Sequence, residues 1–244
     1  MSDQREVELR RRLTAVQDRI AVAAAAAGRP PSDIELLPVT KYFPAADVLT
    51  LARLGCSRFG ESREPEASRK VAQVHQAYSR ATGLRFDMIG RLQRNKAKTV
   101  ARWADRVHSV DSLRIAEALS AAVRAALDEG GRTDPLRVLL QVSLDGDPER
   151  GGVPAAELGP LAERVGALAG LELVGLMAVA PVDALPERWL SSVGQVHQRF
   201  VAAYPQARQL SAGMSGDLEA AITHGSTCVR VGTAIMGSRP ILSP

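Results

Sequence analysis

Apolar residues recur along the chain in two alternating kinds of segment. Short apolar runs predict β-strands at 34–40, 57–60, 85–90, 106–110, 136–144, 171–180, 208–213 and 227–235. Between them, apolar positions spaced three and four apart predict helices at 45–54, 64–79, 93–103, 112–128, 154–169, 186–203 and 217–224. Several of the strands are almost continuously apolar, which is typical of parallel strands covered on both faces.

A longer amphipathic helix is predicted at 5–27, before this alternation begins, and "GRPP" ends it. Eight strands, each followed by a helix or a short tail, predict an α/β fold: a single (β/α)8 TIM barrel with an extra N-terminal helix. The alternative is an open doubly wound sheet, but the first strand lacks the glycine-rich turn that such a sheet uses for a dinucleotide. With no internal repeat or linker, residues 1–244 are expected to form a single domain.

Composition narrows the class of protein. The 244 residues are 45% hydrophobic and 24% charged with a net charge of +4, which is ordinary for a soluble globular protein. The two cysteines, Cys56 and Cys228, are too few for a disulfide framework and show no metal spacing. The N-terminus is a poor signal peptide and no segment is long enough to span a bilayer, so we expect a cytoplasmic monomer without a membrane partner.

Positive charge gathers in one segment, 84–106, which carries seven Lys or Arg residues against two Asp. Four of the basic residues recur at helical spacing on one face: Arg91, Arg94, Lys98 and Arg102. A solvated helix face is the interpretation we favour over contact with phosphate. Nucleic acid is an unlikely partner because only Phe86 and Trp103 could stack on bases.

The first predicted strand ends in a lysine, in "LLPVTKYFP". Strand residues alternate between the barrel interior and the helix layer, so Leu37, Val39 and Lys41 share one face. If that face points inward, Lys41 lies at the carboxyl end of the strand, where barrel active sites form. A desolvated amine there could form a Schiff base with a carbonyl, whereas the alternative is a lysine that merely ends a strand.

The last two strand–helix units contain small residues where a phosphate would bind. "LSAGMSGDLEAAI" places Ser211, Gly213, Ser215 and Gly216 between a strand and a helix, and small side chains let backbone N–H groups approach an anion. The last strand ends in Gly232 and Thr233. Barrels often bind phosphate between the loops after strands seven and eight, so together these turns indicate a phosphate site.

Arg230 is an unusual residue for the interior of a barrel. It stands between Val229 and Val231 and therefore faces the opposite side from both. If the valines pack against helices, the guanidinium points inward and needs a partner, which could be a structural carboxylate or a ring nitrogen of a ligand. A lysine, a phosphate cradle and an inward arginine together describe a pyridoxal phosphate site.

Motifs along nearly the whole chain resemble those of the pyridoxal phosphate homeostasis proteins, a family with the barrel of alanine racemase but without its second domain. The motifs are "VTK" (39–41), "FGE" (59–61), "IGRLQRNK" (89–96), "GLMAV" (175–179), "GMSGDLEAAI" (213–222) and "VRVGTAIMG" (229–237). Two positions depart from the family pattern: Ser62 replaces the common Asn, and Asp87 replaces a common His.

The resemblance implies a role for six residues. Lys41 matches the lysine that forms an aldimine with pyridoxal 5'-phosphate, and Arg230 matches the arginine near the pyridine nitrogen. The positions around the cofactor phosphate are matched by Ser211, Ser215, Gly232 and Thr233.

Two functions then remain open: a carrier that buffers the cofactor and delivers it to apoenzymes, or an amino-acid racemase-like enzyme. A racemase needs acid–base groups on both faces of its substrate. The tyrosines Tyr42, Tyr78 and Tyr204 are not plainly opposite Lys41, and we interpret His75 and His108 as surface or core histidines. The sequence therefore favours the carrier, with no catalytic residue and no metal site.

Overall fold

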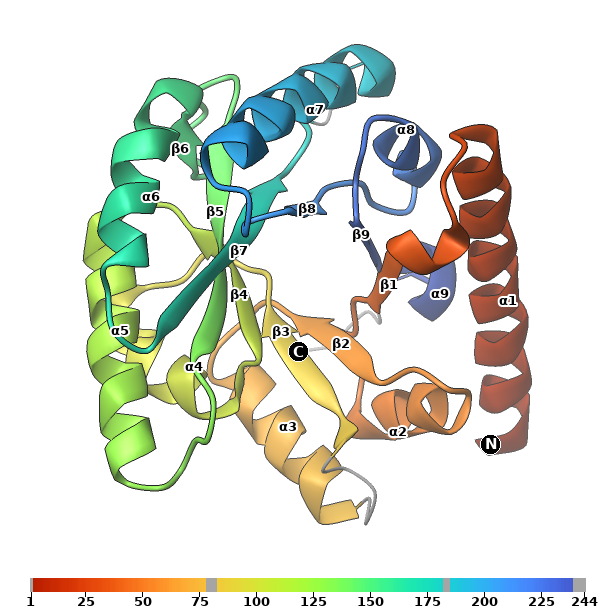
Figure 1. The fold of residues 1–244 in the computed structure, drawn as a ribbon. Coiled ribbons are helices and arrows are strands. Elements are labelled where there is room, and N and C mark those ends of the chain that lie inside the picture. The colour runs from red at the N-terminus through yellow and green to blue at the C-terminus, as the bar shows by residue number, and fades with distance from the viewer. Residues whose placement is uncertain (1, 78–82, 182–184, 239–244) are drawn as a thin grey trace.

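Eight parallel strands and the helices between them make up the part of the chain that the computed structural model describes, residues 2–77, 83–181 and 185–238 (Figure 1). The barrel strands are β1 (Glu35–Pro38), β2 (Arg58–Glu61), β3 (Arg85–Met88), β4 (Arg106–Val110), β5 (Leu136–Ser143), β7 (Leu171–Ala178), β8 (Gln209–Ser211) and β9 (Cys228–Val231). A short strand β6 (Val153–Pro154) pairs only with β5.

The helices alternate with the strands and surround them. They are α1 (Ser2–Ala26), α2 (Ala45–Arg53), α3 (Glu66–Ala77), α4 (Ala97–Trp103), α5 (Leu113–Asp128), α6 (Leu158–Gly166), α7 (Pro186–Ala203), α8 (Leu218–Thr223) and α9 (Thr233–Met236). The described residues also form the 3₁₀ helices η1 (Pro31–Asp33), η3 (Arg94–Lys96) and η4 (Ala155–Glu157). Within the described residues, no helix is both long and apolar enough to cross a membrane.

The strands close into a barrel. Their order is β1-β9-β8-β7-β5-β4-β3-β2, and a parallel bridge between Val39 and Gly60 joins β1 to β2 at the two ends of that order. The predicted (β/α)8 barrel is therefore confirmed. Because all strands run parallel, their carboxyl ends and the loops that follow them gather at one mouth.

The barrel is closely packed where it closes at Gly60. A Cβ at Gly60 would lie 3.4 Å from side-chain atoms of Leu37, Val39 and Ile89. The same contacts place Leu37 and Val39 on the inner face of β1, as the alternation predicts.

Helix α1 completes the outer layer where the barrel's own last helix is a single turn. It contacts α8, α9 and α2 through the predicted apolar stripe, and Leu9, Leu13 and Val16 are buried (Figure 1). The predicted last strand, 227–235, was too long. The strand ends at Val231, and residues 233–236 instead form α9, which turns the chain out of the sheet toward α1.

The other predicted elements agree with the structure to within a few residues. The helix predicted at 93–103 begins as the 3₁₀ turn η3 before α4, and β6 was not predicted, since a two-residue strand has no periodicity. The end of the helix predicted at 64–79 lies outside the described residues.

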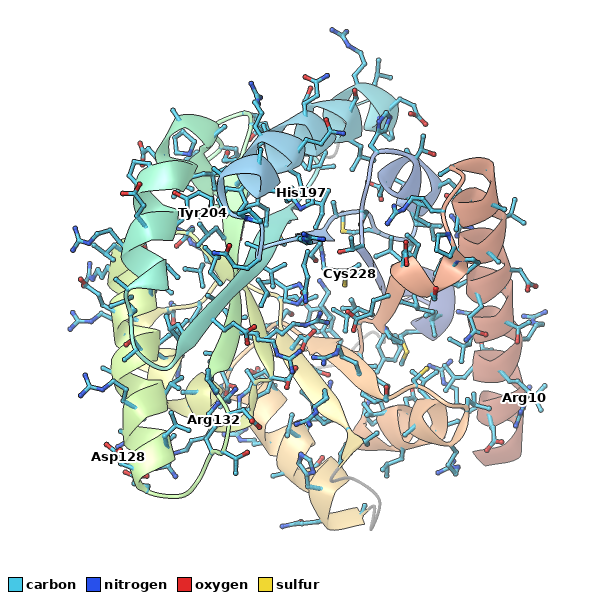
Figure 2. All side chains as sticks on the ribbon, in the orientation of Figure 1. Arg10, Asp128, Arg132, His197, Tyr204 and Cys228 are labelled. Atoms are coloured by element: carbon cyan, nitrogen blue, oxygen red, sulfur yellow. The ribbon has the colours of Figure 1, made fainter. Side chains whose placement is uncertain are left out.

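The barrel separates an apolar shell from a polar interior. Outward-facing strand residues such as Phe59, Phe86 and Val229 pack with the helices in one large core. Inside the barrel, only a small apolar cluster of Leu139, Val174 and Met177 forms. Polar and charged side chains fill much of the rest, and Cys228 lies among them (Figure 2). Such an interior needs internal hydrogen bonds, and the site is built from them.

Candidate functional site

Lys41 begins the turn that follows β1, at the mouth of the barrel, as predicted from its position. Its side chain is exposed, and Nζ lies 5.9 Å from the ring centroid of Tyr42, a residue with a left-handed φ of 70°. The desolvation expected for this amine is therefore not seen, because no side chain covers it. The amine is open to a ligand that enters from solvent.

A buried clamp fixes the backbone just before Lys41. The hydroxyl of Thr40 donates to Oε1 of Glu61 over 2.6 Å, and Nζ of Lys70 donates to the same oxygen and to the carbonyl of Thr40, both over 2.8 Å. Burial raises the pKa of Glu61, whereas the charge of Lys70 and the hydrogen bonds from Lys70 and Thr40 act to lower it. The clamp lies between the barrel strands and helix α3. It holds the carboxyl end of β1 in place and leaves the Lys41 side chain free.

The two small-residue loops meet at the same mouth. The backbone N–H of Ala234 donates to Oγ of Ser215 over 3.2 Å, which joins the β8–α8 loop to the start of α9. Within the described part of the chain, the N–H groups of Ser215, Gly216, Gly232 and Thr233 find no acceptor. Four donors without acceptors on two adjoining loops can bind the oxygens of a phosphate.

Helix α1 anchors the first of these loops from outside the barrel. The guanidinium of Arg19 donates to the carbonyl of Ser215 over 3.1 Å and pairs with Glu219 over 2.6 Å. The N-terminal helix therefore reaches the candidate phosphate loop directly, a contact that the sequence pattern does not reveal.

Arg230 points into the barrel, as its valine neighbours predict. It lies opposite Leu37 in the β1–β9 register and is 5% exposed, while Val229 and Val231 pack with the helices. Its Nη1 donates to Oγ of Ser211 over 2.7 Å and its Nη2 to the carbonyl of Ala178 over 2.8 Å. No carboxylate among the described residues lies within ion-pair distance of this buried cation, and the charge of Asp217 acts on it only from farther away. The guanidinium still has N–H groups to donate.

Ser211 connects Arg230 to a polar network deeper in the barrel. Its Oγ lies 2.9 Å from Nδ1 of His108, and Nε2 of the same ring lies 3.2 Å from Oδ2 of Asp87. Ser211, His108 and Asp87 are each at most 1% exposed. Ser211 was expected beside the phosphate because of its loop, whereas its hydroxyl here bridges Arg230 and His108.

Two arginines and two acids close the floor of the barrel below Asp87. Arg106 donates to Asp87 over 2.7 Å and pairs with Glu35 over 2.8 Å. Arg58 donates to Asp87 over 2.7 Å, pairs with Glu35 over 2.9 Å and also contacts Asp105. The network is continuous from this floor to Arg230.

The network has a defined charge state. Burial alone would raise the pKa of Asp87, but the hydrogen bond from His108 and the charges of Arg106 and Arg58 hold it well below its usual range. Burial lowers the pKa of His108 despite the neighbouring Asp87, and the cations Arg106 and Arg230 lower it further. Asp87 is therefore a carboxylate and His108 a neutral imidazole.

Sequence reasoning missed His108 and Asp87 as parts of the site. The interpretation of His108 as a core histidine is confirmed by its burial, but it contacts Ser211, one of the predicted residues. A usable signal was present, because inward positions of β3, β4, β8 and β9 are polar in otherwise apolar strands, namely Asp87, Arg106, His108, Gln209, Ser211 and Arg230.

The other candidate groups lie away from this centre. The hydroxyl of Tyr204 donates to the carbonyl of Gly159 over 3.0 Å, on the outer helices, and Tyr78 lies outside the described residues. His75 meets the ring of Phe86 edge-on. In the described ranges, no group of three His, Cys, Asp or Glu side chains is placed to hold a metal ion.

The chain is similar to known proteins along nearly its whole length. The family model for the alanine racemase N-terminal domain matches residues 12–240. A pyridoxal phosphate homeostasis protein from Mycobacterium bovis is 51% identical over 248 residues, which cover 98% of this chain and 96% of the relative.

Two solved structures are similar along nearly their whole length. A protein from Bifidobacterium adolescentis described as unknown has a TM-score of 0.86 and 32% identity, with 97% of each chain covered. PipY of Synechococcus elongatus with pyridoxal phosphate (PLP) bound has a TM-score of 0.74 and 30% identity, covering 91% of this chain and 100% of PipY. The chain therefore belongs to the alanine racemase N-terminal domain family and, within it, to the pyridoxal phosphate homeostasis proteins.

Proposed function

We propose that this protein binds pyridoxal 5'-phosphate on Lys41, holds it reversibly and releases it to apoenzymes in the cytoplasm, without a reaction of its own. The names of its relatives and the cofactor bound to PipY support the ligand. The residues at the mouth of the barrel support the manner of binding, with candidate partners for the ring nitrogen, the phosphate and the aldehyde of the cofactor.

The observation that carries the proposal is the buried guanidinium of Arg230. A buried cation without a counter-ion is costly, and its unused N–H groups suit an acceptor that the protein does not supply. The pyridine nitrogen of the cofactor is such an acceptor. Arg230 donates hydrogen bonds and stays protonated, so a ring nitrogen facing it keeps its lone pair and carries no proton.

The phosphate group fits the two loops beside Arg230. The free N–H groups of Ser215, Gly216, Gly232 and Thr233 would donate to its oxygens. Ser215 accepts a hydrogen bond from Ala234, which leaves its own hydroxyl hydrogen available for the phosphate as well. Gly232 is also close to the strand that carries the lysine, since a Cβ at Gly232 would lie 3.6 Å from Cβ of Val39.

Lys41 supplies the covalent link. When bound, the cofactor would supply an aldehyde, and the primary amine of Lys41 is the group that would hold it through a reversible covalent bond, with loss of one water. The exposed position of Lys41 leaves the return reaction open to water, which favours exchange of the cofactor over its retention.

Two features of the site argue against the racemase-like alternative. A ring nitrogen that faces an arginine is a weak electron sink for carbanions, which a racemase must stabilise. Among the described residues, the tyrosine beside Lys41 is Tyr42, its direct neighbour in the chain, and the neutral His108 is occupied by Asp87 and Ser211. The described residues place no second acid–base group opposite Lys41, so we infer that the protein acts as a carrier.

Borohydride reduction followed by peptide mapping tests the link to Lys41. The wild type loaded with the cofactor should show an absorbance band of the imine and a reduced adduct on Lys41. Lys41→Ala should lose both, whereas Lys98→Ala, which changes an exposed lysine on α4, should keep them. An adduct on another lysine would contradict the assignment.

Incubation with single enantiomers of amino acids tests the absence of an activity. The loaded protein should racemise them no faster than the free cofactor does. Turnover above that rate, lost in Lys41→Ala, would establish the enzyme instead of the carrier.

A further inference from the structure

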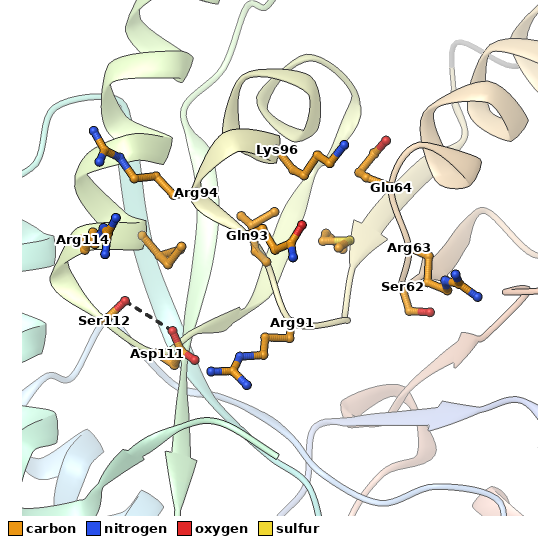
Figure 3. A pocket seen from close by; sticks show the side chains of 13 residues that line it. Ser62, Arg63, Glu64, Arg91, Gln93, Arg94, Lys96, Asp111, Ser112 and Arg114 are labelled. Atoms are coloured by element: carbon orange, nitrogen blue, oxygen red, sulfur yellow. Dashed lines mark hydrogen bonds between the residues drawn. The ribbon is translucent and has the colours of Figure 1, made fainter. Parts of the chain in front are cut away.

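A large pocket opens at the barrel mouth beside the candidate cofactor site, at the ends of β2, β3 and β4. Its volume is about 780 Å³, within the range of small-molecule sites, and Figure 3 shows the residues that line it. The floor is apolar, with Met88, Leu92 and Ile115. None of the six residues predicted to bind the cofactor lines this pocket, so it is a separate feature of the mouth.

The wall of the pocket carries a strong positive charge. Its cations are Arg63, Arg91, Arg94, Lys96 and Arg114, and its acids are Glu64 and Asp111. Arg94 and Arg114 lie close together on one side, and Arg63 lies on the opposite side (Figure 3). Five cations around one hollow repel one another, so an anion bound between them would relieve the repulsion.

Most of these cations have no closely paired carboxylate among the residues that the structure describes. Arg94, Lys96 and Arg114 have no carboxylate within 4 Å anywhere in the described ranges, and Arg63 only reaches Glu66 at 3.9 Å. Arg91 donates to the carbonyl of Pro148 over 3.1 Å, which orients it without neutralising it. Elsewhere on the molecule, comparable arginines such as Arg19 and Arg102 pair with a glutamate over 2.6 Å.

The two acids of the wall are held by other donors. Oε1 of Glu64 accepts from the indole of Trp103 over 2.6 Å, and Oε2 accepts from the hydroxyl of Ser68 over 2.8 Å. Asp111 accepts from Ser112 over 3.3 Å. Helix α5 begins at the same wall with no acidic residue in its first turn, so its dipole adds to the positive potential.

The basic segment 84–106 thereby acquires a different interpretation. Arg91, Arg94, Lys98 and Arg102 do not form one helix face, because Arg91 lies in a loop and Arg94 in η3, before α4 begins at Ala97. Arg91 and Arg94 turn instead to a shared pocket with Arg63, from the loop after β2, and Arg114, from the first turn of α5.

We propose that this pocket binds a small molecule with two anionic groups, phosphates or carboxylates, one at the Arg94 and Arg114 pair and the other toward Arg63. Arginine side chains bind both kinds of group through paired N–H donors. No aromatic ring lines the pocket, and binding of single-stranded nucleic acid relies on such rings, so a small anion fits better than a nucleic acid.

Isothermal titration of the cofactor-loaded protein with inorganic pyrophosphate, and separately with citrate, tests the proposal. Loading fills the proposed phosphate cradle, so the titrated anion reports on the second pocket. We expect binding that weakens with added salt and becomes weaker by at least about tenfold in the double variant Arg94→Gln/Arg114→Gln. Tighter binding of pyrophosphate or of citrate then tells whether the pocket prefers phosphates or carboxylates.

A matched double variant controls for net charge. Arg124→Gln/Arg164→Gln removes two exposed arginines from α5 and α6, outside the pocket, and should bind both anions as the wild type does. The comparison of the two double variants does not depend on the cofactor proposal, because none of these four arginines belongs to the proposed cofactor site. Absence of binding, equal weakening in both double variants, or tighter binding of a short duplex DNA than of either anion would overturn the proposal.

Discussion

The hydroxyl of Ser211 donates its hydrogen to Nδ1 of His108, 2.9 Å away in the barrel interior. The donor in this hydrogen bond is identified from the other nitrogen of the His108 ring. Nε2 faces the carboxylate of Asp87, which can only accept a hydrogen bond. Because the imidazole is neutral, Nε2 then carries its one hydrogen and Nδ1 must accept. Ser211 in turn accepts from Arg230, so the hydrogen bonds run one way from Arg230 to Asp87.

Ser211→Ala should increase the rate at which the protein releases the cofactor. The substitution removes one of the two acceptors that orient the guanidinium of Arg230, and a hydrogen bond of this kind contributes about 1 kcal/mol, so release should become roughly fivefold faster. Dialysis of the loaded protein followed by absorbance measures the rate. The control is Ser109→Ala, a buried serine on β4 that donates to the carbonyl of Gly90. Equal release from both variants would assign Ser211 no role in holding Arg230.

Asp87→Asn should destabilise the fold strongly. Asn has the shape of Asp but not its charge, so Arg58 and Arg106 would keep only the partly exposed Glu35 and Asp105 as counter-ions. Breaking a buried ion network typically costs about 3–5 kcal/mol of the free energy of unfolding. Urea denaturation measures it, with Asp145→Asn as the control, since that exposed carboxylate should contribute less than about 1 kcal/mol. A small change in the free energy of unfolding in Asp87→Asn would show that Glu35 and Asp105 suffice as counter-ions for Arg58 and Arg106.

The sequence was sufficient to predict the barrel and the inward direction of Arg230, because both follow from local alternation. Val229 and Val231 flank Arg230 in sequence, and their burial against helices fixes its side. The same alternation placed Lys41 at the end of β1.

The network below Arg230 could not be predicted in the same way. Ser211 and His108 are 103 positions apart and meet across the barrel interior, so their contact depends on its closure and on side-chain rotamers rather than on local pattern. The pocket has the same origin, since Arg63, Arg94 and Arg114 come from three separate segments, the loop after β2, η3 and the start of α5, that the folded barrel brings together. The exposure of Lys41 depends on the turn at Tyr42, whose left-handed φ the sequence did not indicate.

Arg230→Ala should still form the imine on Lys41 but release the cofactor faster. One charge-assisted hydrogen bond contributes about 1.5–3 kcal/mol, which corresponds to roughly a tenfold to hundredfold change in retention. Arg230→Glu should retain the cofactor less well than Arg230→Ala, because a buried carboxylate repels the phosphate. Dialysis with absorbance detection compares the two. Unchanged retention in both variants would make Arg230 a purely structural residue that ties β9 to Ser211 and Ala178.

Arg19→Ala should weaken retention of the cofactor while leaving stability nearly unchanged. Its guanidinium holds the carbonyl of Ser215 from α1, so its loss frees the loop proposed to bind the phosphate. The pair with Glu219 is exposed and should contribute less than about 1 kcal/mol to the free energy of unfolding. Arg10→Ala, which breaks an exposed pair with Glu6 on the same helix, is the control for both measurements. If Arg19→Ala retains the cofactor as well as the control does, then α1 has no role in cofactor binding.

The stability of the protein should fall as the pH drops below about 6.5, the ordinary pKa of histidine. Burial lowers the pKa values of His108 and His197, so in that range the unfolded chain binds protons that the folded chain does not. Each histidine can add a slope of at most ~1.4 kcal/mol per pH unit, and above pH 6.5 neither contributes. Urea denaturation between pH 5 and 7.5 should show a flatter profile for His108→Gln and for His197→Gln than for the wild type. A profile in His108→Gln as steep as in the wild type would mean that His108 takes up its proton in the folded protein as readily as in the unfolded chain. The charged ring would then donate to Ser211 instead of accepting from it.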